Sequence, residues 1–323
     1  MRADTLNQIL QPSLFEVIDT HVPFYKSNPF WRTLAFRFKK GKVISDTNRY
    51  ILKQLTGKYD LIWVDKAVFI SDKVTKILRI RTNHLVHYTP DTAFEENTSD
   101  LFYNSLSYYD YVITTKSFEK EAYLKYISTE KLLCTPQGFN RKLHYSRHPI
   151  KNKLNRVIFV GLYEAARGKV ISALLKENIP VALAGKNWKD FVKRHQTLPL
   201  TFLGEGLFSE AYANAISESA IGLGLVSKRF PELHTTRTFE IPACGTALAT
   251  ERNEETLFFF EKDEVIFFSS MDELISKIKY YLNEEPELEN ITKKAEKKVY
   301  EFGFDYESQL RKILGVILKK KSF

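Results

Sequence analysis

Short apolar runs alternate with segments of helical periodicity along most of the chain, and this alternation is typical of an open parallel α/β sheet. Glycine, proline or charged residues bound the runs. Strands are expected in the first half at residues 59–64, 83–88, 110–114 and 131–135, and in the second half at residues 156–161, 181–185, 220–226, 246–250 and 264–268. The pattern therefore predicts a doubly wound α/β arrangement in each half.

Helical periodicity marks several intervening segments and both ends of the chain. Helices are expected at residues 1–10, 45–55, 118–126, 209–217, 271–282, 287–300 and 305–318, and a short strand at 15–18. Residues 141–155 are polar and basic without periodicity, which indicates an inter-domain linker. We therefore expect domains at residues 1–148 and 149–304, followed by a C-terminal helix within 305–323.

One segment combines two carboxylates with hydroxyls and a cation. Glu232 and Glu240 stand eight residues apart, with Thr235, Thr236 and Arg237 between them. A helical interval of that length would bring both carboxylates to one face. A helix beginning at Thr235 or Thr236 would also aim free N–H groups at an anion, leaving the carboxylates to bind hydroxyls. The segment thus suits a nucleotide sugar, although a solvated acidic helix face is the commoner reason for such a glutamate pair.

The second domain opens with a strand, a glycine and a basic helix start. Gly161 follows the strand, and Arg167 and Lys169 follow within eight residues, which is a layout for phosphate binding. It is not a Walker loop, and two cations at a helix start are ordinarily solvated. Gly185 and Gly204 end the next two apolar runs, so their loops are further candidates for ligand binding.

In the first domain, Asp91 is the candidate for a general base. It follows the expected strand at 83–88, and the carboxyl ends of parallel strands are where open α/β sheets bind ligands. Asp91 could equally cap the next helix. His87, near the end of the same strand, is more simply explained as a core residue.

The charge balance limits the possible partners. The 323 residues include 48 Lys and Arg against 39 Asp and Glu, a net charge of +9, which favours anionic partners or reflects a diffuse basic surface. No zinc-ligand spacing or RNA-binding signature points to nucleic acid. Two cysteines without a CxxC motif indicate reduced thiols, and no apolar run reaches the roughly 20 residues needed to span a bilayer. We expect a cytoplasmic protein.

The segment Arg-Thr-Phe-Glu-Ile-Pro-Ala-Cys-Gly at 237–245 resembles the transferases akin to spore maturation protein B, within the group 1 glycosyl transferases. The Glu-x(7)-Glu spacing resembles the corresponding element of GT-B glycosyltransferases. In the first half, Trp-Val-Asp-Lys, His-Tyr-x-Pro-Asp, Thr-Thr-Lys and Pro-Gln-Gly-Phe also resemble this family. The resemblance covers nearly the whole chain except the start, where the family's first strand and glycine loop are missing.

This resemblance implies a GT-B fold, with two Rossmann-like domains facing each other across a cleft and a last helix returning to the first domain. It places Glu240 on the nucleotide ribose, Glu232 near the donor sugar and Arg167 by the diphosphate. It also implies that residues 203–207 bind the nucleobase of the donor.

The implied reaction transfers a sugar from a nucleoside diphosphate sugar to an acceptor hydroxyl in surface glycan synthesis. We expect no cofactor and no metal, since Arg167, Arg237 and the amides of 235–237 would offset the leaving diphosphate. The glutamate pair favours retention, whereas inversion would need a base such as Asp91. A GT-B-shaped epimerase and a non-catalytic carbohydrate-binding relative remain open.

Cations cluster near both ends of the chain, at Arg37, Lys39, Lys40 and Lys42 and at Lys319, Lys320 and Lys321. Lipid-linked acceptors, which the resemblance implies, would suit an enzyme held at an anionic membrane surface by these charges. Solubility alone is the alternative explanation.

Overall fold

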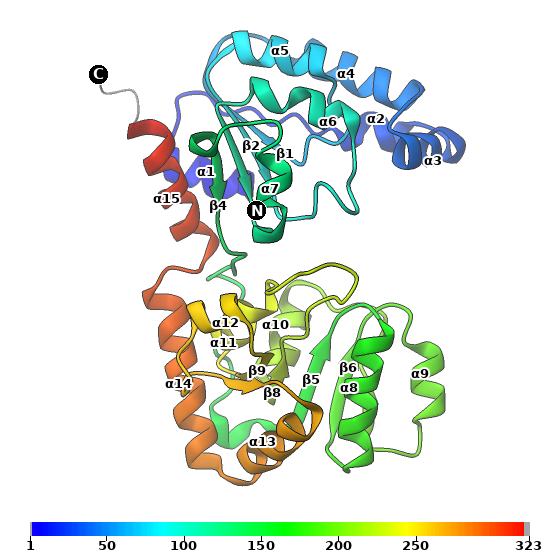
Figure 1. Ribbon diagram of the computed structural model, residues 1–323, viewed down its shortest axis with the longest axis vertical. Coiled ribbons are helices and arrows are strands. Elements are labelled where there is room, and N and C mark those ends of the chain that lie inside the picture. The colour runs from blue at the N-terminus through cyan, green and yellow to red at the C-terminus, as the bar shows by residue number, and fades with distance from the viewer. Residues whose placement is uncertain (1, 320–323) are drawn as a thin grey trace. The chain divides into compact units, whose positions relative to one another are not determined.

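The computed structural model describes residues 2–319 and divides into two compact units. The first comprises the chain up to Pro136 together with the chain from Leu310 onward, and the second comprises Gln137–Gln309 (Figure 1). The expected boundary at 148/149 lies later along the chain than this division.

The first unit is built on a four-stranded parallel sheet in the order β1-β2-β3-β4. Its strands are β1 (Tyr59–Asp65), β2 (Thr82–Thr89), β3 (Tyr111–Thr114) and β4 (Leu132–Cys134). Its helices are α1 (Arg2–Leu10), α2 (His21–Lys26), α3 (Pro29–Phe38), α4 (Lys42–Gln54), α5 (Asp72–Ile80), α6 (Asp100–Ser105), α7 (Lys120–Tyr123) and most of α15 (Tyr306–Lys319).

Side-chain alternation along β2 divides this core into two layers. Leu85 packs with residues of α4, α5, α6 and α7 on one face. Val86 and Tyr88 pack on the other face with Ile313 and Ile317 of α15, and α1 joins the same side through a cluster around Leu6. The last helix therefore belongs to the core of the first unit.

One expectation for the first unit is wrong, and another is confirmed. Residues 15–18 form no strand, and Phe15 and Val17 on this segment are exposed. An apolar run becomes a strand only where a neighbouring strand can pair with it. His87 is fully buried between Phe102 and Tyr109, and burial lowers its pKa to about 3, so it is a neutral core residue.

The second unit contains a six-stranded parallel sheet in the order β10-β9-β8-β5-β6-β7. Its strands are β5 (Leu154–Val160), β6 (Val181–Ala184), β7 (Leu200–Phe202), β8 (Ser219–Leu223), β9 (Ala247–Glu251) and β10 (Ile266–Phe268). Its helices are α8 (Ala165–Lys176), α9 (Lys189–Arg194), α10 (Ser209–Ser217), α11 (Arg237–Ala243), α12 (Glu254–Phe259), α13 (Met271–Asn283) and α14 (Glu285–Glu301). The predicted α/β class with two Rossmann-like sheets is confirmed.

Helices cover both faces of this sheet. Val157 and Phe159 of β5 pack toward α8, α9 and α13, whereas Ile158 packs toward α10, α11 and α14. Because β5 lies between β6 and β8, the strand order reverses there, and the crevice outside the carboxyl ends of β5 and β8 is the place where such folds bind ligands.

Residues 141–155 are not a free linker. Arg141 forms an ion pair with Asp305, and the backbone N–H of Arg147 donates to Ser217. His144 is buried against Tyr212. This polar segment is therefore attached to the second unit by specific contacts. Composition alone does not distinguish such a segment from a solvated linker.

Candidate functional site

Glycines stand at the carboxyl ends of three neighbouring strands of the second unit. Gly161 follows β5 and donates to Ala184, and Gly185 follows β6 and donates to the carbonyl of Gly204, which follows β7. Gly185 has φ +142, and a Cβ atom there would lie 1.9 Å from the carbonyl oxygen of Gly161. Trp188 donates its indole N–H to that same oxygen at 2.8 Å. The three candidate glycines thus lie along one sheet edge.

Two arginines gather on one aromatic ring beside this edge. The guanidinium carbons of Arg167 and Arg237 lie 5.7 and 5.6 Å from the centroid of Phe159, the residue two positions before Gly161. Burial, and next the neighbouring Arg237 cation, lower the pKa of Arg167. Two cations held together away from water are costly unless an anion compensates them.

The protein compensates this charge only in part. Glu164 pairs with Arg167 at 2.7 Å, and its other oxygen accepts from the hydroxyl of Ser227 at 3.1 Å. Arg167 Nε and Arg237 Nε are buried without a hydrogen-bond partner among residues 2–319. The hydroxyl of Thr235 is in the same condition. Buried donors of this kind need an acceptor, and an anionic ligand at the switch point would supply it.

Glu232 does not lie on a helix. Residues 231–235 are irregular, Thr236 is the N-cap and α11 begins at Arg237, so the expected helical alignment of Glu232 with Glu240 is wrong. Tertiary contacts hold this loop instead: His234 accepts from the backbone N–H of Gln137 at 3.0 Å and pairs with Glu255. Glu232 still acts electrostatically on Arg167, whose protonated form it favours.

Glu240 lies in the first turn of α11 and is engaged by neighbours. Its side chain is 12% exposed, and the hydroxyl of Tyr212 donates to Oε2 at 2.6 Å. The hydroxyl of Thr236 also hydrogen-bonds to it, and His144 lies 3.9 Å from Oε1. Burial raises the pKa of Glu240. This carboxylate is positioned from three sides.

Helix α11 is short because Pro242 lies inside it and Gly245 follows it. Pro242 has no N–H to continue the hydrogen-bond ladder, and Gly245 has φ +65, which turns the chain toward β9. These two residues confine α11 to the 7 residues that carry Arg237 and Glu240.

Lys169 does not join this cluster, and Asp91 belongs to the other unit. Lys169 is exposed on α8, and residues two apart on a helix do not share a face with each other, so it points away from Arg167. Asp91 belongs to the first unit, where it follows β2 and forms an ion pair with Lys66. Its side chain is 40% exposed.

Sequence reasoning missed several residues of this site: Phe159, Glu164, His144, Tyr212 and His234. Phe159 is an ordinary strand residue by pattern, and Tyr212 is indistinguishable from core by spacing. Glu164, three residues before Arg167, is the exception, because an i, i+3 acid and base pair at a helix start is readable from sequence.

The described residues neither span a membrane nor form a metal cluster. Within residues 2–319, no helix combines the length and the apolar character that crossing a bilayer requires. Over the same residues, His, Cys, Asp and Glu side chains do not gather in threes suited to a metal ion.

Residues 167–315 match a family model described as glycosyl transferase-like. The matched range begins at Arg167 and includes Glu232, Arg237 and Glu240. No curated protein sequence matches the chain at a significant level.

Solved structures match over both units. A glycosyltransferase from Rickettsia africae covers 100% of this chain and 94% of its own, with 15% identity and a TM-score of 0.63. The chain has the GT-B glycosyltransferase fold. Sucrose-phosphate synthase from Thermosynechococcus elongatus shares this GT-B fold at 17% identity, covering 86% of this chain and 78% of its own, with a TM-score of 0.58. HepE from Anabaena, solved with UDP-glucose, shares it at 16% identity, covering 84% of this chain and 82% of its own, with a TM-score of 0.57.

Proposed function

We propose that this GT-B protein is a glycosyltransferase that moves a sugar from a nucleoside diphosphate sugar to an acceptor hydroxyl. The observation that carries the proposal is the pair of arginines on Phe159, whose buried Nε atoms have no hydrogen-bond partner among the described residues. HepE, which has the same fold, was solved with UDP-glucose, and this supports a uridine nucleotide as the first donor to test.

In this proposal the diphosphate lies between Arg167, Arg237 and the glycine-bounded sheet edge. The two guanidinium groups offset the charge that develops on the leaving diphosphate, so the reaction proceeds without a metal ion or other cofactor. Glu240 holds the ribose hydroxyls, with Tyr212 fixing its orientation through the 2.6 Å hydrogen bond. Glu232, on the neighbouring loop, contacts the donor sugar.

We propose retention of anomeric configuration, in line with the glutamate pair. Asp91, which forms an ion pair with Lys66, is the base that an inverting mechanism would use. Analysis of the product's anomeric configuration by NMR decides between the two courses. The acceptor is a glycan or lipid-linked hydroxyl in polysaccharide or lipopolysaccharide synthesis, and we place the enzyme in the cytoplasm at the inner face of the membrane.

Isothermal calorimetry with UDP, GDP and their glucose or mannose conjugates tests the donor site. The wild-type protein should bind one nucleotide class, and Arg237→Ala should weaken that binding by about 2 kcal/mol, as expected for a charge-assisted hydrogen bond. Arg194→Ala, an exposed arginine on α9, is the matched control and should bind like wild type. Equal nucleotide affinity of Arg237→Ala and wild type would contradict the placement of the diphosphate at this cluster.

A further inference from the structure

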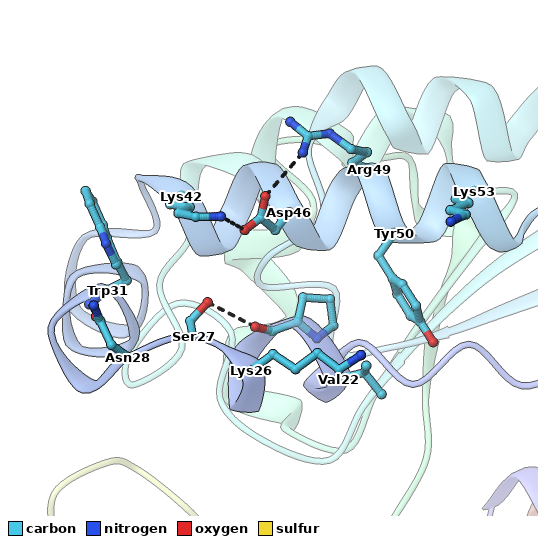
Figure 2. Close-up of a pocket in the computed structure, with 11 residues that line it drawn as sticks. Val22, Lys26, Ser27, Asn28, Trp31, Lys42, Asp46, Arg49, Tyr50 and Lys53 are labelled. Atoms are coloured by element: carbon cyan, nitrogen blue, oxygen red, sulfur yellow. Dashed lines mark hydrogen bonds and ion pairs between the residues drawn. The ribbon is translucent and has the colours of Figure 1, made fainter.

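Helix α4 carries a polar stripe that lines a cavity in the first unit. Lys42, Asp46, Arg49 and Lys53 recur at intervals of four, three and four residues, which keeps them on one face. Figure 2 shows this stripe along α4, with Lys26 of α2 lying below it. The cavity has a volume of about 630 Å³ and is bounded by α2, α3 and α4.

The cavity has an excess of positive charge. Four cations and one carboxylate line it, giving +4 − 1 = +3. Asp46 is already paired with Lys42 at 2.5 Å and lies 3.5 Å from Arg49, whereas Lys26 and Lys53 are exposed. A ligand for this site would therefore carry negative charge, and phosphate is the group that clustered Lys and Arg bind best.

Helices α2 and α3, which bound this cavity, also leave aromatic side chains in solvent. They pack on the unit through a small separate cluster of Ala35, Val43 and Ile44. Their outward residues include Tyr25, Phe30, Phe36 and Phe38, which are 68%, 66%, 65% and 56% exposed. Exposed aromatic rings gathered on two consecutive short helices indicate an interaction surface.

Cations lie among these exposed rings. Arg37 lies over the ring of Phe38 at 5.5 Å, and Lys39 lies over the ring of Phe36 at 4.9 Å. Aromatic rings with adjacent Lys or Arg suit the boundary between lipid headgroups and acyl chains, where the ring is partly buried and the cation meets lipid phosphate. A folded protein partner would explain the exposed rings, but it would not explain the excess of cations in the cavity.

We propose that α2, α3 and α4 form a docking site for an anionic phospholipid bilayer. A lipid phosphate enters the cavity between Lys26, Arg49 and Lys53, and Phe30 and Phe36 enter the headgroup boundary. The docking site rests on the proposed function only for its purpose, which is to bring the enzyme to a lipid-linked acceptor. The charge clusters alone predict purely electrostatic binding to the membrane. The proposed docking site adds insertion of aromatic side chains to that attraction. Of the cations expected to contribute, Lys42 lines the cavity, whereas Lys320 and Lys321 lie outside the described residues.

Co-sedimentation of the full chain with vesicles tests this site. Vesicles of phosphatidylcholine alone are compared with vesicles that also contain phosphatidylglycerol, at low and high salt. A cavity variant (Lys26→Gln, Arg49→Gln, Lys53→Gln) should bind the anionic vesicles at least tenfold more weakly, because each cation near the surface contributes about fivefold. An aromatic variant (Phe30→Ser, Phe36→Ser) should retain salt-sensitive binding but lose the fraction that survives high salt.

A matched control removes the same charge from the second unit. Lys176→Gln, Lys193→Gln and Lys262→Gln, all exposed there, should leave vesicle binding within about twofold of wild type. Equal loss in the control and cavity variants would overturn the site in favour of a diffuse charge effect. Binding of glycerol 3-phosphate in the cavity without vesicle binding would also overturn it, in favour of a soluble phosphorylated ligand. UDP affinity measured on the same variants tests the proposed donor site separately, since these substitutions lie in the other unit.

Discussion

At the scale of single residues, the arginine pair and the glutamate of α11 differ in what holds them. Arg167 pairs with Glu164 and donates to the carbonyl of Leu162, whereas Arg237 donates to the carbonyl of Leu225. Since both cations share one aromatic ring, removal of either relieves repulsion. Only the loss of Arg167 leaves a partly buried carboxylate without its cation.

We therefore expect the two arginines to contribute differently to the stability of the protein but similarly to its activity. Arg237→Ala should change the melting temperature little, whereas Arg167→Ala should lower the free energy of unfolding by about 3 kcal/mol. The reason is that Glu164 loses its partner in an ion pair in which the side chains of Arg167 and Glu164 are 7% and 12% exposed. Both should lower kcat/KM. Calorimetric melting checks the difference, and adding Glu164→Gln to Arg167→Ala should recover part of the stability. Equal losses for both single variants would contradict this reading of the pair.

Glu240 gives a prediction that separates charge from orientation. Glu240→Gln should weaken nucleoside diphosphate binding by about 1–3 kcal/mol, because ribose hydroxyls lose a charged acceptor. Tyr212→Phe removes the 2.6 Å hydrogen bond but keeps the carboxylate, so its effect should be smaller. Titration calorimetry measures both. Unchanged affinity in a folded Glu240→Gln protein would end the ribose assignment.

At this scale the sequence was informative about residue types and less so about their partners. Arg237 and Glu240 could be picked out because an unusual string contains them, and Arg167 because a strand and a glycine precede it. Tyr212 and His144 could not, because their contacts with Glu240 cross long chain separations that only the tertiary fold creates.

At the scale of elements, periodicity located most of the strands and the longer helices. It was less successful with α2 and α3, which are short and held by a satellite cluster, and with the loop at 231–235, which His234 fixes through Gln137 and Glu255. The helical alignment of Glu232 with Glu240 depended on a local rule, and long-range contacts to His234 overrode it.

Helix α15 supplies a prediction at this scale. Leu310 and Leu314 are buried against α1 and β1, so Leu314→Ala should destabilise the first unit by about 2–5 kcal/mol. Val316→Ala on the same helix is the control, because Val316 is 43% exposed. Hydrogen exchange of the β1 to β3 amides reports the first unit directly. Equal protection in the Leu314→Ala protein and the control would show that α15 does not stabilise this sheet.

At the scale of the whole molecule, each unit contains a buried histidine that stays neutral. Burial lowers the pKa of His87 to about 3, and burial, then Arg147, lower the pKa of His144 to about 4, against an ordinary value of 6.5. Below 6.5 the unfolded chain takes up protons that the folded chain does not, so stability falls as the pH drops toward these values.

Urea unfolding across this window measures the effect. His144→Gln should make the acid-side loss of stability shallower, because one of the two proton uptakes is removed. Identical pH slopes in wild type and His144→Gln would contradict the neutral assignment of His144.

The two-unit α/β architecture followed from the alternation of strands and helices, but the exact division did not. The chain between Gln137 and Arg147 is polar and still belongs to the second unit through specific contacts such as Arg141 with Asp305. Polar composition predicts that a segment is exposed to solvent. It does not predict which unit the segment belongs to, because that depends on the specific contacts that its side chains make.

The central claim is that the arginine cluster at the β5/β8 switch point binds the diphosphate of a sugar donor for transfer. Release of nucleoside diphosphate from a panel of nucleotide sugars, with and without glycan acceptors, tests it most directly. The account predicts release from one donor, acceleration by an acceptor, and loss of release in Arg237→Ala but not in Arg194→Ala. Absence of both nucleotide binding and release across the panel, in folded wild-type protein, would contradict it.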